Sequence, residues 1–109
     1  MQYINLTQHT ITDVMTGKTY EPSGIEARAS TKATLLNEID GTKIYAYKQV
    51  DIESLPEPKP NTMYIVSNMA LNAVPEHRID VVAPGPAKRS VRGSVIGCRG
   101  FQQKHNKIA

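Results

Sequence analysis

The residues best suited to chemistry are arginines, and four of the five lie in the last third of the chain: Arg78, Arg89, Arg92 and Arg99. From residue 78 to residue 107, seven basic residues stand against a single acid, so this segment carries about +6, while residues 1–77 carry about −3. Arginine presents a rigid fork of donors that suits phosphate, and its plane can stack on adenine. We therefore expect anions to be drawn to one end of the molecule.

Three of these arginines surround a predicted hairpin. The residues from Val91 to Cys98 are typical of a turn that leads into a last strand. If the chain turns near Arg92, then Arg89 and Arg99 fall on opposing arms and can meet on one face. The glycines here do not form a phosphate-binding P-loop, because neither the required Lys nor a helix follows them. The alternative is that these arginines only keep a surface soluble.

Two amide side chains form a second candidate group. The residues that follow Ser67 predict a two-turn helix, with Ser67 as its N-cap and a proline at its end. Asn68 and Asn72 lie four residues apart and so share one face of that helix. With Arg78 close behind them, they could donate to and accept from a base edge or a ribose. The alternative is an ordinary solvated helix face.

Catalysis is the weaker interpretation. Ser67 follows an apolar run, as a nucleophile does in a strand–turn–helix elbow, but it lacks the flanking glycines of that turn. Glu76, His77 and Asp80 do not have the spacing of a metal site. We therefore predict no catalytic residue, no metal ligand and no cofactor. The histidines that would serve an enzyme as bases are His9, His77 and His105.

Composition indicates one small domain. The chain has 109 residues, of which 39% are hydrophobic and 21% charged, which is ordinary for a globular protein. Since there is no Trp and one Phe, the core must consist of aliphatic side chains and Tyr, and we expect a neighbouring subunit to add stability. The net charge of +3 is too small to favour duplex nucleic acid, and few aromatic residues are placed for base stacking.

The expected compartment is a reducing cytoplasm. Cys98 is the only cysteine, so no intrachain disulfide can form. The N-terminus lacks the pattern of a signal peptide, and no apolar stretch approaches 18 residues, so we expect no membrane contact. The Asn5–Leu6–Thr7 sequon is interpreted as chance.

The elements that must position these side chains are mostly strands. Two further hairpins are predicted, one around Gly17 and one around Asp40–Gly41, the second being a strong two-residue turn signal. A loop over residues 51–61 is expected to pack Leu55 on the core. The remaining strands are expected at residues 2–6, 25–29, 63–66, 79–83 and up to Cys98, with 63–66 buried on both faces and joined to 79–83 through the helix.

These elements predict an α+β fold. It consists of a small, mixed, mostly antiparallel sheet with one or two short helices in an oligomeric protein. Residues 1–101 are expected to form the single domain, and residues 102–109 a polar C-terminal tail.

Five short motifs along the chain, taken in order, are similar to a family of small phage and prophage proteins. They are Asn5–His9 (Asn-Leu-Thr-x-His), Ala27–Ser30 (Ala-Arg-x-Ser), Tyr64–Ser67 (Tyr-Ile-Val-Ser), Asp80–Gly85 (Asp-Val-Val-x-Pro-Gly) and Gly97–Phe101 (Gly-Cys-Arg-Gly-Phe). The family resembles the first type of phage Thoeris anti-defence proteins, which sequester cyclic ADP-ribose signals and in some cases also cyclic oligonucleotides.

This resemblance implies a homo-oligomer, a dimer or a hexamer. It would bind an anionic nucleotide second messenger between subunits in the host bacterial cytoplasm and release it intact. Two alternatives remain: a protein-binding inhibitor or accessory module of a host or phage enzyme, and a small nucleotide hydrolase that uses His9 or His77. From residue chemistry and motif position, the candidate ligand-binding residues are Arg28, Asn68, Asn72, Arg78, Arg89, Arg92 and Arg99.

Overall fold

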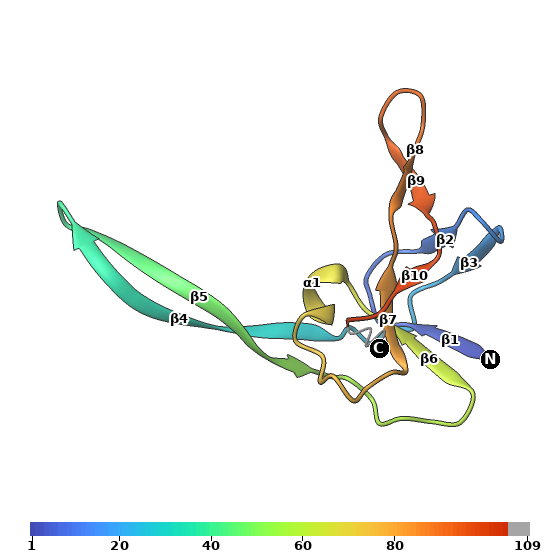
Figure 1. Ribbon diagram of the computed structural model, residues 1–109, viewed down its shortest axis with the longest axis horizontal. Coiled ribbons are helices and arrows are strands. Elements are labelled where there is room, and N and C mark those ends of the chain that lie inside the picture. Colours follow the sequence, from blue (N-terminus) through green and yellow to red (C-terminus); the bar gives the residue numbers. More distant parts are fainter. Residues whose placement is uncertain (105–109) are drawn as a thin grey trace, which may run out of the picture.

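Two small sheets and one long hairpin make up residues 1–104, the part of the chain that the computed structural model describes, except for the side chains of residues 49 and 50 (Figure 1). The first sheet has the strand order β1–β6–β7–β10, the second has the order β3–β2–β9–β8, and β4 pairs only with β5. A single helical turn, α1, is the one helix in this part of the chain, and it is too short to cross a membrane.

The first sheet is built on three parallel strands. β1 (Gln2–Asn5) pairs with β6 (Thr62–Ile65), and β6 pairs with β7 (Val81–Pro84) through a crossover that contains α1 (Asn68–Leu71). β10 (Phe101–Gln102) adds an antiparallel edge. The predicted strand–helix–strand unit is therefore confirmed. The helix itself is shorter than predicted, because only residues 68–71 are helical before a series of turns.

The second sheet contains two of the three predicted hairpins. β2 (Ile11–Asp13) and β3 (Lys18–Tyr20) are antiparallel. Gly17, in the turn between them, has φ of 76°, which lies in the left-handed region that favours glycine. β8 (Ala87–Arg89) and β9 (Val95–Cys98) form a second hairpin that projects from the body (Figure 1). β9 joins β2 through one parallel pair, Asp13 with Cys98.

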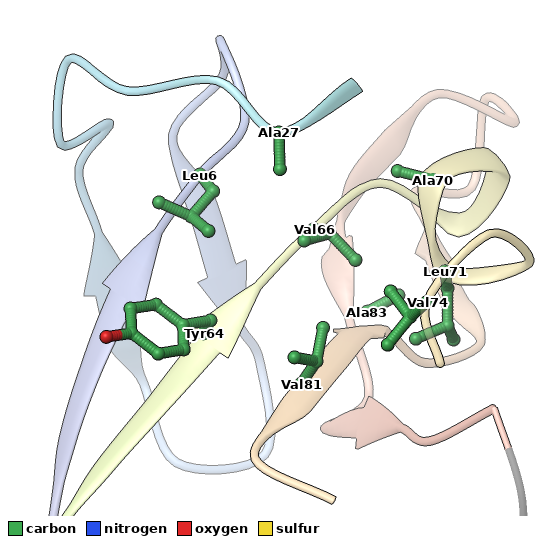
Figure 2. Close-up of a cluster of buried hydrophobic side chains, with 9 residues drawn as sticks. All are labelled: Leu6, Ala27, Tyr64, Val66, Ala70, Leu71, Val74, Val81 and Ala83. Atoms are coloured by element: carbon green, nitrogen blue, oxygen red, sulfur yellow. The ribbon is translucent and has the colours of Figure 1, made fainter. Parts of the chain in front are cut away.

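The core lies on both faces of the first sheet. On one face, Tyr64, Val66, Val81 and Ala83 pack with α1 and with Leu6 (Figure 2). On the other face, alternate residues of the same strands pack against the second sheet; this cluster consists of Ile11, Ile65, Val82 and Cys98. Two-sided burial explains why residues 63–66 form a continuous apolar run, as predicted.

The third hairpin extends away from this body (Figure 1). β4 (Arg28–Ile39) and β5 (Thr42–Glu53) have twelve residues each and are joined by Asp40 and Gly41, with φ of 50° and 80°. Positive φ at both positions is the requirement of the tight turn that the sequence predicted. The radius of gyration of the chain is 16.7 Å, against about 13 Å for a compact domain of this length. We call β4, β5 and their turn the arm.

Other boundaries moved relative to the predictions. The strand expected at residues 25–29 begins only at Arg28. Of the side chains expected on its buried face, Ala27 is buried but Ile25 is exposed. β5 continues to Glu53, so the proline-rich loop starts later than expected, and Leu55 packs against the core as predicted. β10 extends one residue into the segment expected as the tail, and residues 105–109 of that tail lie outside the described residues. The mixed, mostly β architecture with one short helix agrees with the predicted α+β class.

Burial in the first sheet predicts a matched pair of mutational effects. Val66 is fully buried and Val91, at the tip of the β8–β9 hairpin, is fully exposed. We expect Val66→Ala to lower the free energy of unfolding by about 1–3 kcal/mol, because it removes buried methyl groups and leaves a cavity. Val91→Ala should change it by less than about 0.5 kcal/mol. Urea denaturation followed by circular dichroism measures both, and equal effects would contradict this assignment of the core.

Candidate functional site: a groove at the strand ends

The hollows most suited to a ligand lie where the three parallel strands end. Their carboxyl ends are in register, since Asn5 pairs with Ile65 and Ile65 with Val82. The segments that follow these strands, residues 6–10, 67–68 and 85–87, line adjoining hollows. In open sheets with parallel strands, ligands are commonly bound outside the carboxyl ends of the strands. We call this region the strand-end groove.

The first hollow, of about 240 Å³, lies between the two sheets. Thr10, Thr12 and Asn68 contribute its polar side chains, and the rest of its wall is apolar or backbone. The residues that line it are Thr10, Ile11, Thr12, Asn68, Pro84, Gly85, Ala87, Val95, Gly97 and Cys98. A hydroxyl and amide lining on an apolar wall can orient a polar ring or a ribose without supplying charge.

Close backbone packing forms the floor of this hollow. A Cβ atom on Gly97 would lie 2.7 Å from the carbonyl oxygen of Thr12, and one on Gly85 would lie 2.7 Å from the carbonyl oxygen of Arg99. Neither contact is possible for a real side chain, so glycine is required at both positions for the segments to approach this closely. These glycines therefore help to shape the hollow.

The second and third hollows, of about 160 and 260 Å³, share Glu26, Ala27 and Ser67. Gln8 and His9 line the second, and Arg28 lines the third. The Glu26 carboxylate accepts hydrogen bonds from Gln8 Nε2 at 2.7 Å and from Arg28 Nη2 at 2.8 Å. The bond from Arg28 lowers the pKa of Glu26 below its ordinary value. Arg28 is therefore held at the groove by one of its five N–H donors, and its side chain is 64% exposed.

Asn5, which was not among the predicted site residues, fixes the loop that lines the second hollow. Asn5 is 1% exposed, and its Nδ2 donates to the carbonyl oxygens of His9 at 2.7 Å and Tyr20 at 2.9 Å. Its Oδ1 accepts from the backbone N–H and the hydroxyl of Thr7, at 2.8 and 2.7 Å. The Asn-x-Thr pattern that was interpreted as a chance sequon thus forms a buried side-chain turn. An Asn at the end of a strand, followed by Thr, was the available signal.

Ser67 has the role that was predicted for it. Its hydroxyl accepts a hydrogen bond of 3.0 Å from the backbone N–H of Ala70, which makes it the N-cap of α1. Next to it, the Oδ1 of Asn68 accepts a hydrogen bond from Gln102 of β10, and the same Gln102 amide also donates to the carbonyl of Pro84. Asn68 is thereby held in position at the edge of the first hollow.

The arginines predicted to bind ligand are distributed over several places. Arg89 pairs with Val95, a lining residue of the first hollow, so the two side chains share one face of the hairpin. Arg92 lies in the exposed turn, and Arg99 lies beyond the base of the hairpin, after Cys98. The expectation that Arg89 and Arg99 meet on opposing arms is therefore wrong, because the hairpin places them at different levels.

Arg78 and Asn72 lie outside the lining of the groove. The Arg78 guanidinium donates to both oxygens of Asp80, from Nε at 2.9 Å and from Nη2 at 3.0 Å, and also to the carbonyl of Pro56 at 2.8 Å. The hydrogen bonding between the two side chains raises the pKa of Arg78 and lowers the pKa of Asp80. Both side chains are mostly buried, so the pair ties the loop before β6 to the start of β7. Asn72 is the C-cap of α1, and its carbonyl accepts from Lys104 Nζ at 2.8 Å.

Within residues 1–104, no group of three or more His, Cys, Asp or Glu side chains lies close enough together to hold a metal ion. Comparison of the chain with protein-family models, with curated proteins and with solved structures found no match.

The ion pair between Arg78 and Asp80 predicts a pH dependence of stability. The folded pKa of Asp80 is lower than its ordinary value of 3.8, so the pair contributes stability above that pH and loses it as the pH falls through the folded value. At pH 7, Asp80→Asn should lower the free energy of unfolding by about 1–2 kcal/mol. The difference from wild type should shrink below pH 3.8. Urea titrations at several pH values test this, with the exposed Asp51→Asn as control; a difference independent of pH would contradict it.

Proposed function

We propose that the strand-end groove binds an anionic nucleotide-type ligand and that the protein acts by sequestering this ligand and releasing it unchanged. The observation that carries the proposal is the composition of the groove. Loops from the ends of three parallel strands bring hydroxyl, amide and backbone groups together there, and cationic Arg28 lines the third hollow. Arg89 lies nearby on the β8–β9 hairpin, opposite the lining residue Val95, and its guanidinium donates to the carbonyl oxygen of Gly93 at 2.9 Å. Uncharged groups can orient a base and ribose, while arginine binds phosphate.

The size of the hollows supports a ligand held between subunits. The first hollow has about 240 Å³ and the third about 260 Å³, whereas pockets for drug-sized ligands occupy about 300–1,000 Å³. A second chain that closes over the groove would supply the missing wall. The same closure would remove water from Arg28 and Arg89, and desolvated charge-assisted hydrogen bonds are stronger than exposed ones.

The class of ligand comes from the family resemblance. The motifs that are similar to phage Thoeris anti-defence proteins include Asn5–His9, Ala27–Ser30 and Tyr64–Ser67, and these three segments border the second and third hollows. We therefore propose that the ligand is a cyclic ADP-ribose isomer or a cyclic oligonucleotide of bacterial immunity. Sequestration works by mass action, so the sites must outnumber the signal and the Kd must be nanomolar, about −12 kcal/mol.

Ligand capture and release test this proposal directly. The pure protein is incubated with cyclic ADP-ribose isomers and with cyclic di- and trinucleotides, separated from unbound ligand, and then heated. We expect mass spectrometry of the supernatant to recover at least one of these compounds intact. Recovery of a chemically altered compound would instead indicate a nucleotide hydrolase, and retention of none of them would refute binding of this ligand class.

Replacement of Arg28 and Arg89 tests the site. Arg28→Ala and Arg89→Ala should each weaken binding of the captured nucleotide at least about tenfold in calorimetry, because each removes a charge-assisted hydrogen bond. Lys59→Ala removes the same charge from the loop before β6, at the opposite end of that strand, and should change the Kd by less than about twofold. Equal effects of all three substitutions would show that only the net charge matters.

A second candidate function has one observation in its favour. The β8–β9 hairpin carries Lys88, Arg89 and Arg92 together with Val91 and Val95, both of which are exposed. Cations mixed with apolar side chains on a projecting hairpin are suited to an acidic protein surface. If no nucleotide is retained, a module that binds and inhibits another protein is the function to test next.

A further inference from the structure

An acidic side chain lies in the middle of the strand-end groove. Among the described residues that line the three hollows, Glu26 is the only acid. It lines both the second and the third hollow, and also a further one of about 260 Å³ beside Gln8. A carboxylate repels phosphate, so its presence in a groove for an anionic ligand needs a reason.

Only one oxygen of the Glu26 carboxylate is occupied. Gln8 Nε2 at 2.7 Å and Arg28 Nη2 at 2.8 Å both donate to Oε2, whereas no group within residues 1–104 donates to Oε1. The bond from Arg28 lowers the pKa of Glu26, so the carboxylate is ionised at neutral pH. The side chain is 33% exposed. Glu26 is therefore a fixed acceptor with one oxygen free for a donor on a ligand.

Arg28 is not an isolated cation. It donates to Glu26, and it lies directly opposite Glu53 where β4 pairs with β5. The hydrogen bond to Glu26 and the charge of Glu53 both raise the pKa of Arg28. Two acids thus stand against one base, and a small anion that approaches Arg28 is repelled by both carboxylates. A phosphate that binds here must bring a further group that offsets this repulsion.

A hydroxyl group has the chemistry that this place requires. It can donate to Glu26 Oε1 and at the same time accept from a neighbouring donor. Ser67, which lines the same two hollows, accepts at 3.0 Å from the backbone N–H of Ala70 and keeps its own proton for donation. Ala27, Ala70 and Met69 give the third hollow an apolar wall for the carbon atoms of a sugar. An acid that accepts from a ribose hydroxyl is a common arrangement in nucleotide sites.

We propose that Glu26 makes the groove selective for ribonucleotides. Its Oε1 accepts a hydrogen bond from a free ribose hydroxyl, while Arg28 binds the neighbouring phosphate with its remaining N–H groups. The charge of Glu26 rejects small anions and nucleotides that lack this hydroxyl. Specificity of this kind combines an attractive contact to the right ligand with repulsion of the wrong one. The inference rests on the proposed function and adds the part of the ligand that the second and third hollows recognise.

Inorganic pyrophosphate tests the repulsive half of the proposal. Glu26→Gln removes the charge but keeps the size of the side chain and one oxygen for Gln8 and Arg28. In calorimetry at neutral pH, this variant should bind pyrophosphate at least about threefold more tightly than wild type. The double variant Glu26→Gln/Arg28→Ala should lose that gain. Glu38→Gln, the same change on the arm, should alter the Kd by less than about twofold.

A gain in affinity cannot arise from a variant that fails to fold. Pyrophosphate binding by Glu26→Gln that is no tighter than that of wild type would therefore overturn the proposal, as would a gain that persists without Arg28.

Ribose hydroxyls test the attractive half. Cyclic ADP-ribose isomers and cyclic di- and trinucleotides are compared with counterparts that lack the free ribose hydroxyls. For each compound that the protein retains, wild type should bind the deoxy counterpart at least about tenfold more weakly. In Glu26→Gln this difference should shrink to less than about threefold, because the acceptor that distinguishes the pair is gone.

The outcomes separate this inference from the proposed function. Retention of a nucleotide and of its deoxy counterpart with equal Kd would leave the proposed function standing and overturn the role of Glu26. Retention of none of the compounds would refute both.

Discussion

The two-sided burial of β6 is the constraint on which the rest of the structure depends. Tyr64 and Val66 face α1 and Leu6, whereas Ile65 between them faces the second sheet. A strand with apolar side chains on both faces needs a layer on each side, and a chain of this size has little else with which to build a core. β1 and β7 pair with β6 in parallel, and this pairing brings the carboxyl ends of the three strands together.

That alignment determines where polar groups can gather. The chain leaves the sheet at the same edge three times, and each departure is held by a local interaction rather than by the core. The side chain of Asn5 holds the first turn, the hydroxyl of Ser67 caps the second, and Gly85 lets the third approach the backbone near Arg99. The groove is therefore a consequence of the topology, and its lining depends on which residues follow each strand.

Two features of the described residues are open to solvent. The hollows are small for a nucleotide, and the arm exposes tyrosine and leucine side chains along one face. The root of the arm and the third hollow share Arg28 and Ala29. Two of the five tyrosines lie on the arm rather than in the body.

Much of the fold could be predicted from the sequence alone, because it depends on interactions between residues close together in the chain. The Asp40–Gly41 turn, the Ser67 cap and the apolar run of β6 were predicted because each depends on residues within a few positions of one another. The roles of the arginines were not accessible in this way. Arg78 binds Asp80 and a carbonyl 22 residues away, while Arg89 and Arg99, expected to meet, lie at different levels of a hairpin. Positive charge in a sequence indicates what a segment can attract, but only tertiary structure decides which charges are already neutralised by the chain itself.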